Sequence, residues 1–145
     1  MAKKAVCIGI NDYPGFDMDL AGCVNDAKAW ADTLGSYGFD CVSLLNDQAT
    51  KKQMLGALSL LLKTAGPEDT IAFTYSGHGT WVPDTNGDEP DGKDEALCPY
   101  DMGRDGKNLI IDDEIQKLIA SRPVGVRVLL ITDSCHSGTV FRALD

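Results

Sequence analysis

Apolar positions follow two different patterns along this chain. Short, nearly continuous apolar runs occur at residues 4–10, 39–45, 69–76 and 126–132, and small or polar residues follow each run. Runs of this length bounded by turn residues predict buried strands. Apolar residues recur every three or four positions at residues 21–37, after Thr50, and at residues 112–121, which predicts three helices. The pattern therefore indicates four strands alternating with helices.

The ends of the predicted helices carry recognisable signals. Thr50 is a suitable N-cap for the second helix, and the Gly66-Pro67 pair ends it. Asp112 or Asp113 is the expected cap of the third helix. Residues 77–108 show no helical or strand periodicity and are predicted to be irregular.

Alternating strands and helices, with strands that are apolar on both faces, predict a single α/β domain over residues 1–145. Its mostly parallel sheet would carry helices on both faces. Ligands of such sheets bind at the carboxyl ends of the strands. The fourth strand lies close to Asp145, so we expect either a second segment that completes the sheet or a chain that is a fragment or a processed subunit.

Composition narrows the range of functions. Apolar residues make up 43% of the 145 residues and charged residues 24%, which is ordinary for a globular protein. The net charge of -9 argues against a nucleic-acid partner, and no apolar run is long enough to cross a membrane. The five cysteines form no CxxC pair, which predicts free thiols, no zinc site and a cytoplasmic location. Cys7 and Cys41 lie inside apolar runs and are expected in the core.

Two short motifs follow predicted strands and carry candidate chemistry. The first is Tyr-Ser-Gly-His-Gly at residues 75–79, and the second is Asp-Ser-Cys-His-Ser-Gly at residues 133–138. A thiol attacks a carbonyl as thiolate and needs a basic neighbour, a role that imidazole fills near neutral pH. We therefore expect His78 and Cys135 to meet at one edge of the sheet as a cysteine-hydrolase dyad.

Each of these residues also has a simpler interpretation. A lone cysteine at a strand end is usually a buried, inert thiol, and a lone histidine is usually a structural residue. Their occurrence together, in small-residue segments after two strands, favours the dyad. His136 is a rival base, but neighbouring residues of a strand point to opposite faces.

Together the two motifs resemble those of the metacaspases, caspase-like cysteine peptidases whose bacterial members are often called orthocaspases. Four further segments match the family in the correct order: residues 6–11, 20–27, 88–92 and 111–114. The resemblance implies a caspase-like three-layer sandwich. It also implies that this chain is the p20 catalytic region of a bacterial-type member, without the p10-like small subunit that completes the sheet and much of the cleft.

The resemblance assigns roles to individual residues. His78 and Cys135 would be the catalytic pair, and the backbone N–H groups of Gly79 and Cys135 the oxyanion hole. Metacaspases cleave after Arg or Lys, and their acidic S1 pocket maps onto Asp26 and Asp133. A buried or half-buried carboxylate pair suits a guanidinium or ammonium group. The alternatives are a helix N-terminal charge for Asp26 and a turn carboxylate for Asp133.

An acidic stretch raises the question of a metal. Asp and Glu far outnumber Lys and Arg between Asp84 and Asp105. The segment imitates an EF-hand in part, but Glu89 stands where that loop needs glycine. No cofactor is required for the chemistry. The resemblance implies possible calcium activation, with ligands at Asp94, Asp112 and Asp113, although Arg142 replaces an aspartate of the family site. A solvated acidic loop with helix-capping aspartates is the alternative.

The sequence thus predicts a cysteine endopeptidase acting on protein or peptide substrates with a basic P1 residue. Its dyad would form a thioacyl intermediate. The other reading is a non-enzymatic p20-only scaffold or regulatory subunit that binds partners through an open sheet edge.

Overall fold

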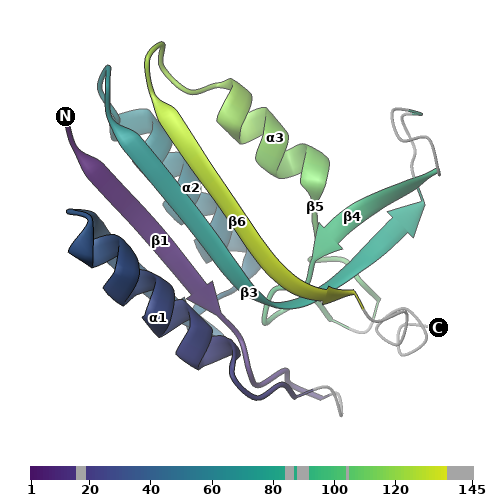
Figure 1. Ribbon diagram of the computed structural model, residues 1–145. Helices are drawn as coiled ribbons and strands as arrows, with labels where there is room; N and C mark the ends of the chain where they lie inside the picture. Colours follow the sequence, from purple (N-terminus) through teal and green to yellow (C-terminus); the bar gives the residue numbers. More distant parts are fainter. Residues whose placement is uncertain (16–18, 84–86, 88–91, 104, 137–145) are drawn as a thin grey trace.

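The four apolar runs form the parallel part of one sheet. The computed structural model describes residues 1–15, 19–83, 87, 92–103 and 105–136, and Figure 1 shows its sheet with helices on both faces. The elements in chain order are β1 (Lys3–Gly9), α1 (Cys23–Ser36), β2 (Asp40–Leu45), the 3-10 turn η1 (Asn46–Gln48), α2 (Lys51–Thr64), β3 (Thr70–Pro83), β4 (Lys93–Leu97), β5 (Ile110–Ile111), α3 (Asp112–Ala120) and β6 (Arg127–His136).

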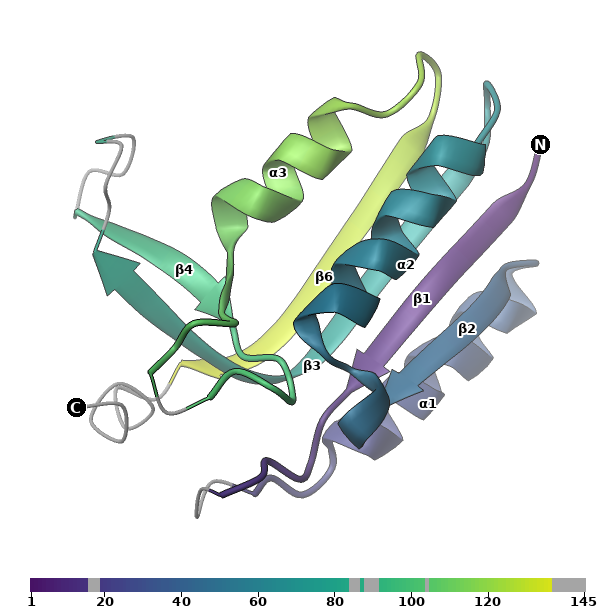
Figure 2. The same cartoon turned by 180° about the vertical axis from the view of Figure 1, so that it is seen from behind.

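Strands β2, β1, β3 and β6 lie side by side and run parallel. β4 pairs antiparallel with the second half of β3, and β5 pairs antiparallel with β4. In Figures 1 and 2 this antiparallel part bends away from the parallel strands. The α/β class, the caspase-like architecture and the helices on both faces are confirmed, and the sheet is parallel only in its four-stranded part.

Two strand ends were predicted too early. β3 continues beyond Ser76 to Pro83, and β6 continues beyond Thr132 to His136. β4 lies in the stretch predicted to be irregular and pairs with residues 79–83 of β3. Its hydrogen bonds satisfy the backbone of β3 where the glycines suggested a turn, so pairing overrides the local signal.

Side-chain alternation along the central strands divides the core between the two faces. The face under α1 carries small residues (Ala5, Cys7 and Ala72), and it packs against Leu34, Trp30 and Ala31 of that helix. The opposite face carries Val6, Ile8, Ile71, Phe73 and Tyr75 and packs under α2 and α3, which lie on that side in Figure 2. α1 approaches β1 so closely that a Cβ on Gly9 would lie 2.5 Å from the carbonyl oxygen of Cys23.

The helix caps match the sequence signals in one case and not in another. The Thr50 hydroxyl accepts the N–H of Gln53, as predicted for the start of α2. Neither Asp112 nor Asp113 caps α3: the N-cap is Ile111, and the Glu114 carboxylate accepts its backbone N–H at 2.9 Å. Glu114 is the third residue of the helix, the position from which a Glu side chain reaches back to the N-cap N–H, whereas Asp112 and Asp113 are the first and second.

Candidate active site

His78 and Cys135 occupy paired positions on adjacent parallel strands. The register of β3 and β6 sets His78 directly opposite Cys135, and Ser76 opposite Asp133. The sequence had suggested that both residues lie just beyond the strand ends. In the structure both lie within the strands. The His78 side chain is 7% exposed. The topology thus brings the two predicted catalytic residues to neighbouring positions, although they are far apart along the chain.

The backbone of His78 is fixed on both sides. Its N–H donates to the Tyr13 hydroxyl at 3.0 Å. Its carbonyl accepts from the Tyr75 hydroxyl at 2.6 Å and from the Cys98 N–H at 3.0 Å. Gly79, a predicted oxyanion donor, follows in β3 and stands opposite His136 of β6. The amides of Gly79 and Cys135 therefore belong to neighbouring positions of two paired strands.

The predicted S1 carboxylates line one hollow. Asp26 and Asp133 border a depression of about 290 Å³ together with Ala29, Trp30 and Thr33 of α1. The Ser76 hydroxyl donates to Asp26 at 3.2 Å and so connects this hollow to β3. The expectation that the two carboxylates are buried or half-buried is wrong, since both residues are exposed. Asp26 lies in the first turn of α1 and Asp133 on the outermost parallel strand, so neither has a covering element among the described residues.

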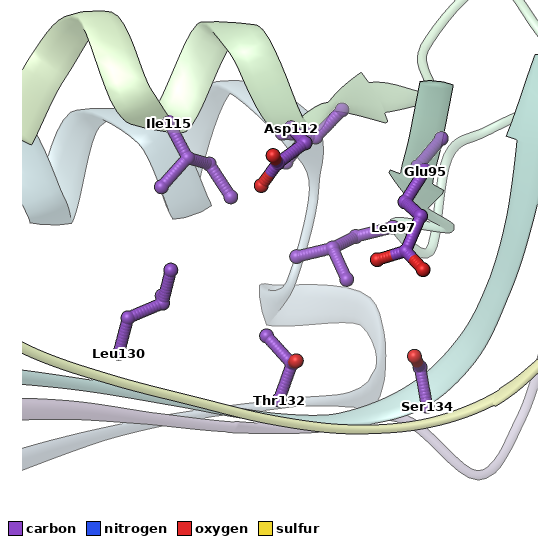
Figure 3. Close-up of a pocket in the computed structure, with 9 residues that line it drawn as sticks. Glu95, Leu97, Asp112, Ile115, Leu130, Thr132 and Ser134 are labelled. Carbon is purple, nitrogen blue, oxygen red and sulfur yellow. The ribbon is translucent and has the colours of Figure 1, made fainter. Parts of the chain in front are cut away.

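A second hollow lies on the opposite face of β6, as Figure 3 shows. Leu130, Thr132 and Ser134 of β6 form one side, and Ile115 of α3 lies across from them. The volume is about 60 Å³. Because successive residues of a strand point to opposite faces, Asp133 belongs to the first hollow while Thr132 and Ser134 belong to the second.

The second hollow contains one of the three predicted calcium ligands. Asp112 and Glu95 direct their carboxylates toward it in Figure 3. Asp94 is buried and, like Asp113, is not part of the lining. Within the described ranges, no group of three or more His, Cys, Asp or Glu side chains is placed to hold a metal ion. Arg142 and part of the acidic stretch lie outside the described residues, and calcium stays a prediction.

Two of the other cysteines, Cys7 and Cys98, belong to the core. Cys7 and Cys98 are fully buried, and burial raises the pKa of both thiols, that of Cys98 to about 12. Such thiols stay protonated at neutral pH and are poor nucleophiles. Cys7 is a core residue as predicted, whereas Cys41 is only partly buried. Among the described helices, none has the length and hydropathy needed to cross a membrane.

Sequence reasoning missed several residues around the site. The sequence assigns no site role to Tyr13, and Tyr75 enters only as part of the motif at residues 75–79. Trp30 also has no predicted site role, yet it lines the hollow with Asp26. The i, i+4 spacing of Asp26 and Trp30 was the available signal, since residues at that spacing share one helix face.

Comparison with known proteins agrees with this arrangement. Residues 3–144 match the sequence model of the family described as metacaspase, peptidase C14 domain. Metacaspase-1 of Cryptococcus neoformans is 42% identical over 94% of this chain and 32% of its own length, and Metacaspase-4 of Arabidopsis thaliana is 43% identical over 95% and 34%. The chain therefore spans about a third of the length of these curated relatives.

A solved structure extends the likeness to the fold. The crystal structure of a protein from Geobacter sulfurreducens matches with a TM-score of 0.81 and 37% identity, over 98% of this chain and 53% of that one. The curated relatives named above are fungal and plant proteins, whereas the Geobacter protein is bacterial. That this chain is a bacterial-type member therefore stays a prediction. On the match of the family model and the identity to curated members, this chain belongs to the metacaspase family of cysteine peptidases.

Proposed function

We propose that this chain is the p20 catalytic region of a cysteine endopeptidase that cleaves peptide bonds after Arg or Lys. The observation that carries the proposal is the register pairing of His78 with Cys135, two strand positions beyond the pairing of Ser76 with Asp133, a residue that borders the acidic hollow. Nucleophile, base and a cation-binding surface thus belong to one end of two adjacent strands.

The reaction has two stages. In the first, the Cys135 thiolate attacks the scissile carbonyl carbon, and a C–S bond forms while the N–H groups of Gly79 and Cys135 stabilise the oxyanion. The protonated imidazole of His78 gives its proton to the leaving nitrogen as the C–N bond breaks. In the second stage, His78 takes a proton from water, the resulting hydroxide attacks the thioester, and the released Cys135 thiolate closes the cycle.

The hollow beside Asp26 and Asp133 supports a basic P1 side chain. Two exposed carboxylates in a protein of net charge -9 attract cations. A guanidinium can donate to both carboxylates through its fork of N–H groups, and the indole of Trp30 adds a π face for the same cation. Neutral and acidic P1 side chains gain none of these interactions.

A fluorogenic peptide series that varies only the P1 residue tests the proposal on the full-length protein. We expect cleavage with P1 Arg and Lys and none with P1 Asp. Cys135→Ala should lose cleavage altogether, with Cys41→Ala on β2 as the matched control for removal of a thiol outside the site. Equal cleavage by wild type and Cys135→Ala would refute the mechanism. A preference for P1 Asp would refute the assignment of Asp26 and Asp133 to the P1 pocket.

The outer edge of β6 supports a p10-like partner segment. Among the described strands β6 pairs only with β3, and Leu129 on it is 46% exposed. An unpaired apolar strand edge in water invites another strand. We propose that a p10-like subunit adds a strand there and completes the cleft, and cross-linking of a cysteine placed at Leu129 to that subunit tests the placement.

The same edge also favours a second candidate, a non-enzymatic scaffold that binds partners through β6. A peptide probe with a P1 arginine and a thiol-reactive group separates the two functions. The peptidase should be labelled at Cys135 in preference to the other cysteines, and the labelling should require His78. A scaffold would show no such preference.

A further inference from the structure

Two buried tyrosines meet beneath the backbone of His78. The Tyr13 and Tyr75 hydroxyls lie 3.4 Å apart, and both donate to the carbonyl of Cys98 at 2.9 Å. Tyr13 accepts the N–H of His78, and Tyr75 donates to its carbonyl. Both tyrosines are buried, and burial raises the pKa of each phenol, so both hydroxyls stay protonated. The hydroxyl pair therefore holds the peptide groups on both sides of His78.

Tyr13 also reaches the imidazole itself. Its ring centre lies 4.9 Å from that of His78, with the ring planes tilted by 54°. This separation is within the range of favourable tilted aromatic pairs. Tyr13 is 3% exposed and His78 is 7% exposed, so water has little access to the contact. Tyr13 thus contacts both the backbone and the ring of the residue proposed as base.

The glycine before His78 fits this arrangement. A Cβ on Gly77 would lie 2.7 Å from the Tyr75 hydroxyl oxygen and 2.9 Å from that of Tyr13. Both separations are shorter than ordinary van der Waals contact. Gly77 is therefore needed to admit the two hydroxyls, in addition to any room that it leaves for substrate.

The loop after β1 holds Tyr13 in place. The Asn46 side-chain carbonyl accepts the N–H groups of Asn11 and Asp12, and the Asp19 carboxylate accepts the N–H of Tyr13 at 3.0 Å. Asn46 itself adopts a positive φ of 50°, a conformation that asparagine tolerates better than most residues. Several side-chain hydrogen bonds therefore hold the loop segment that contains the buried Tyr13.

We propose that Tyr13 is the positioning residue of His78: its hydroxyl fixes the backbone of β3, and its ring restricts the imidazole to the orientation that serves Cys135. This inference rests on the proposed peptidase function. The base must take and give protons at a fixed place during two successive steps, so a loosely held ring would lower the rate of both. Tyr75 secures the same peptide from the other side through its hydroxyl.

Three variants of the full-length protein test the role through kcat and KM with an Arg-P1 peptide. Tyr13→Phe keeps the ring and removes the hydroxyl, and it should lower kcat by about 10-fold with little change in KM. Tyr13→Leu removes the ring as well and should lower kcat by about 100-fold. Tyr37→Phe, at a tyrosine that is 69% exposed, is the matched control and should match wild type.

A nuclear magnetic resonance measurement distinguishes positioning from mere support of the fold. The chain has only two histidines, so the His78 imidazole signals can be assigned with a His136→Gln variant. Wild type should show a nuclear Overhauser effect between the Tyr13 ring and the His78 imidazole. The chemical shifts of the imidazole protons should change in Tyr13→Leu, which loses the ring contact, and stay unchanged in Tyr37→Phe.

The outcomes separate this inference from the proposed function. Active wild type with unchanged kcat in both folded Tyr13 variants would overturn the positioning role alone. So would absence of the Overhauser effect in wild type, a result that does not depend on whether any variant folds. Wild type that cleaves no Arg or Lys peptide, while the ring contact is present, would overturn the peptidase function instead.

Discussion

The two ends of the parallel strands use polar groups in opposite ways. At the amino end, Asp69 accepts the N–H groups of Ala2 and Gly66 at 2.7 and 2.8 Å, and its own carbonyl accepts the N–H of Arg127. At the carboxyl end, the carboxylates of Asp26 and Asp133 border an open hollow. The Asp69 carboxylate at the amino end binds backbone N–H groups of two segments. The carboxylates of Asp26 and Asp133 at the carboxyl end are exposed and can bind a ligand.

This difference follows from where connections cross the sheet. The amino end joins α2 to β3 and α3 to β6 through short segments, so backbone donors converge on one carboxylate. The carboxyl end carries the continuation of β3 and β6 and the loop of Tyr13, which together hold the candidate residues. Substitutions at the carboxyl end should therefore change activity, and those at the amino end should change stability.

The largest effect is expected from His78→Ala. Loss of the general acid and base should lower kcat by about 100- to 10,000-fold. The melting temperature should change little. Initial rates with an Arg-P1 peptide, together with thermal unfolding, measure both quantities. Retention of most activity in this variant would mean that another group, such as His136, is the base.

A smaller loss is expected from Asp133→Asn. A charged hydrogen bond is worth about 1.5–3 kcal/mol, so kcat/KM for P1 Arg should fall about 10- to 100-fold. Glu95→Gln is the matched control, because it removes a carboxylate from the hollow on the other face of the sheet. Equal losses in the two variants would show that overall negative charge, and not the hollow of Asp133, attracts the substrate.

Trp30→Leu should have a few-fold effect on selectivity. A guanidinium stacked on an indole gains about 0.5–1 kcal/mol at an exposed site. The ratio of kcat/KM for P1 Arg over P1 Lys should therefore decrease by about 2- to 5-fold. An unchanged ratio would place the P1 side chain away from the indole.

Asp69→Asn should leave activity unchanged and affect stability in a pH-dependent way. Hydrogen bonds from the Ala2 and Gly66 amides lower the pKa of Asp69 from its ordinary 3.8. A carboxyl with a lowered pKa in the folded state stabilises the fold above its ordinary pKa, and this contribution is lost as the pH falls through the lowered value.

Urea unfolding of wild type and Asp69→Asn at a series of pH values checks this expectation. The variant should be less stable at pH 6, and the difference should shrink as the pH drops below 3.8. A difference that is independent of pH would assign the effect to the amide substitution itself. A change in kcat would contradict the division of roles between the two ends.

Local signals predicted most elements but not the extent of the site strands. The cap at Thr50 and the apolar runs are set by neighbours in sequence, and they were placed correctly. The continuation of β3 through Gly77 and Gly79 depends on β4 and β6, whose pairing no local pattern reveals. Cap choice at α3 failed for a different, local reason: the helix begins one residue earlier than the aspartates suggested, with Ile111 as N-cap and its N–H bound by Glu114.

The sequence by itself determined which reactive groups the candidate site can use: the thiol of Cys135, the imidazole of His78 and the carboxylates of Asp26 and Asp133. Only the tertiary structure decided that His78 and Cys135 share one register position and that Asp26 and Asp133 border one exposed hollow. It also decided that Tyr13 lies against the imidazole. The physical reason is that residue type fixes what a group can do, whereas strand register and loop closure, which join distant segments, fix what it meets.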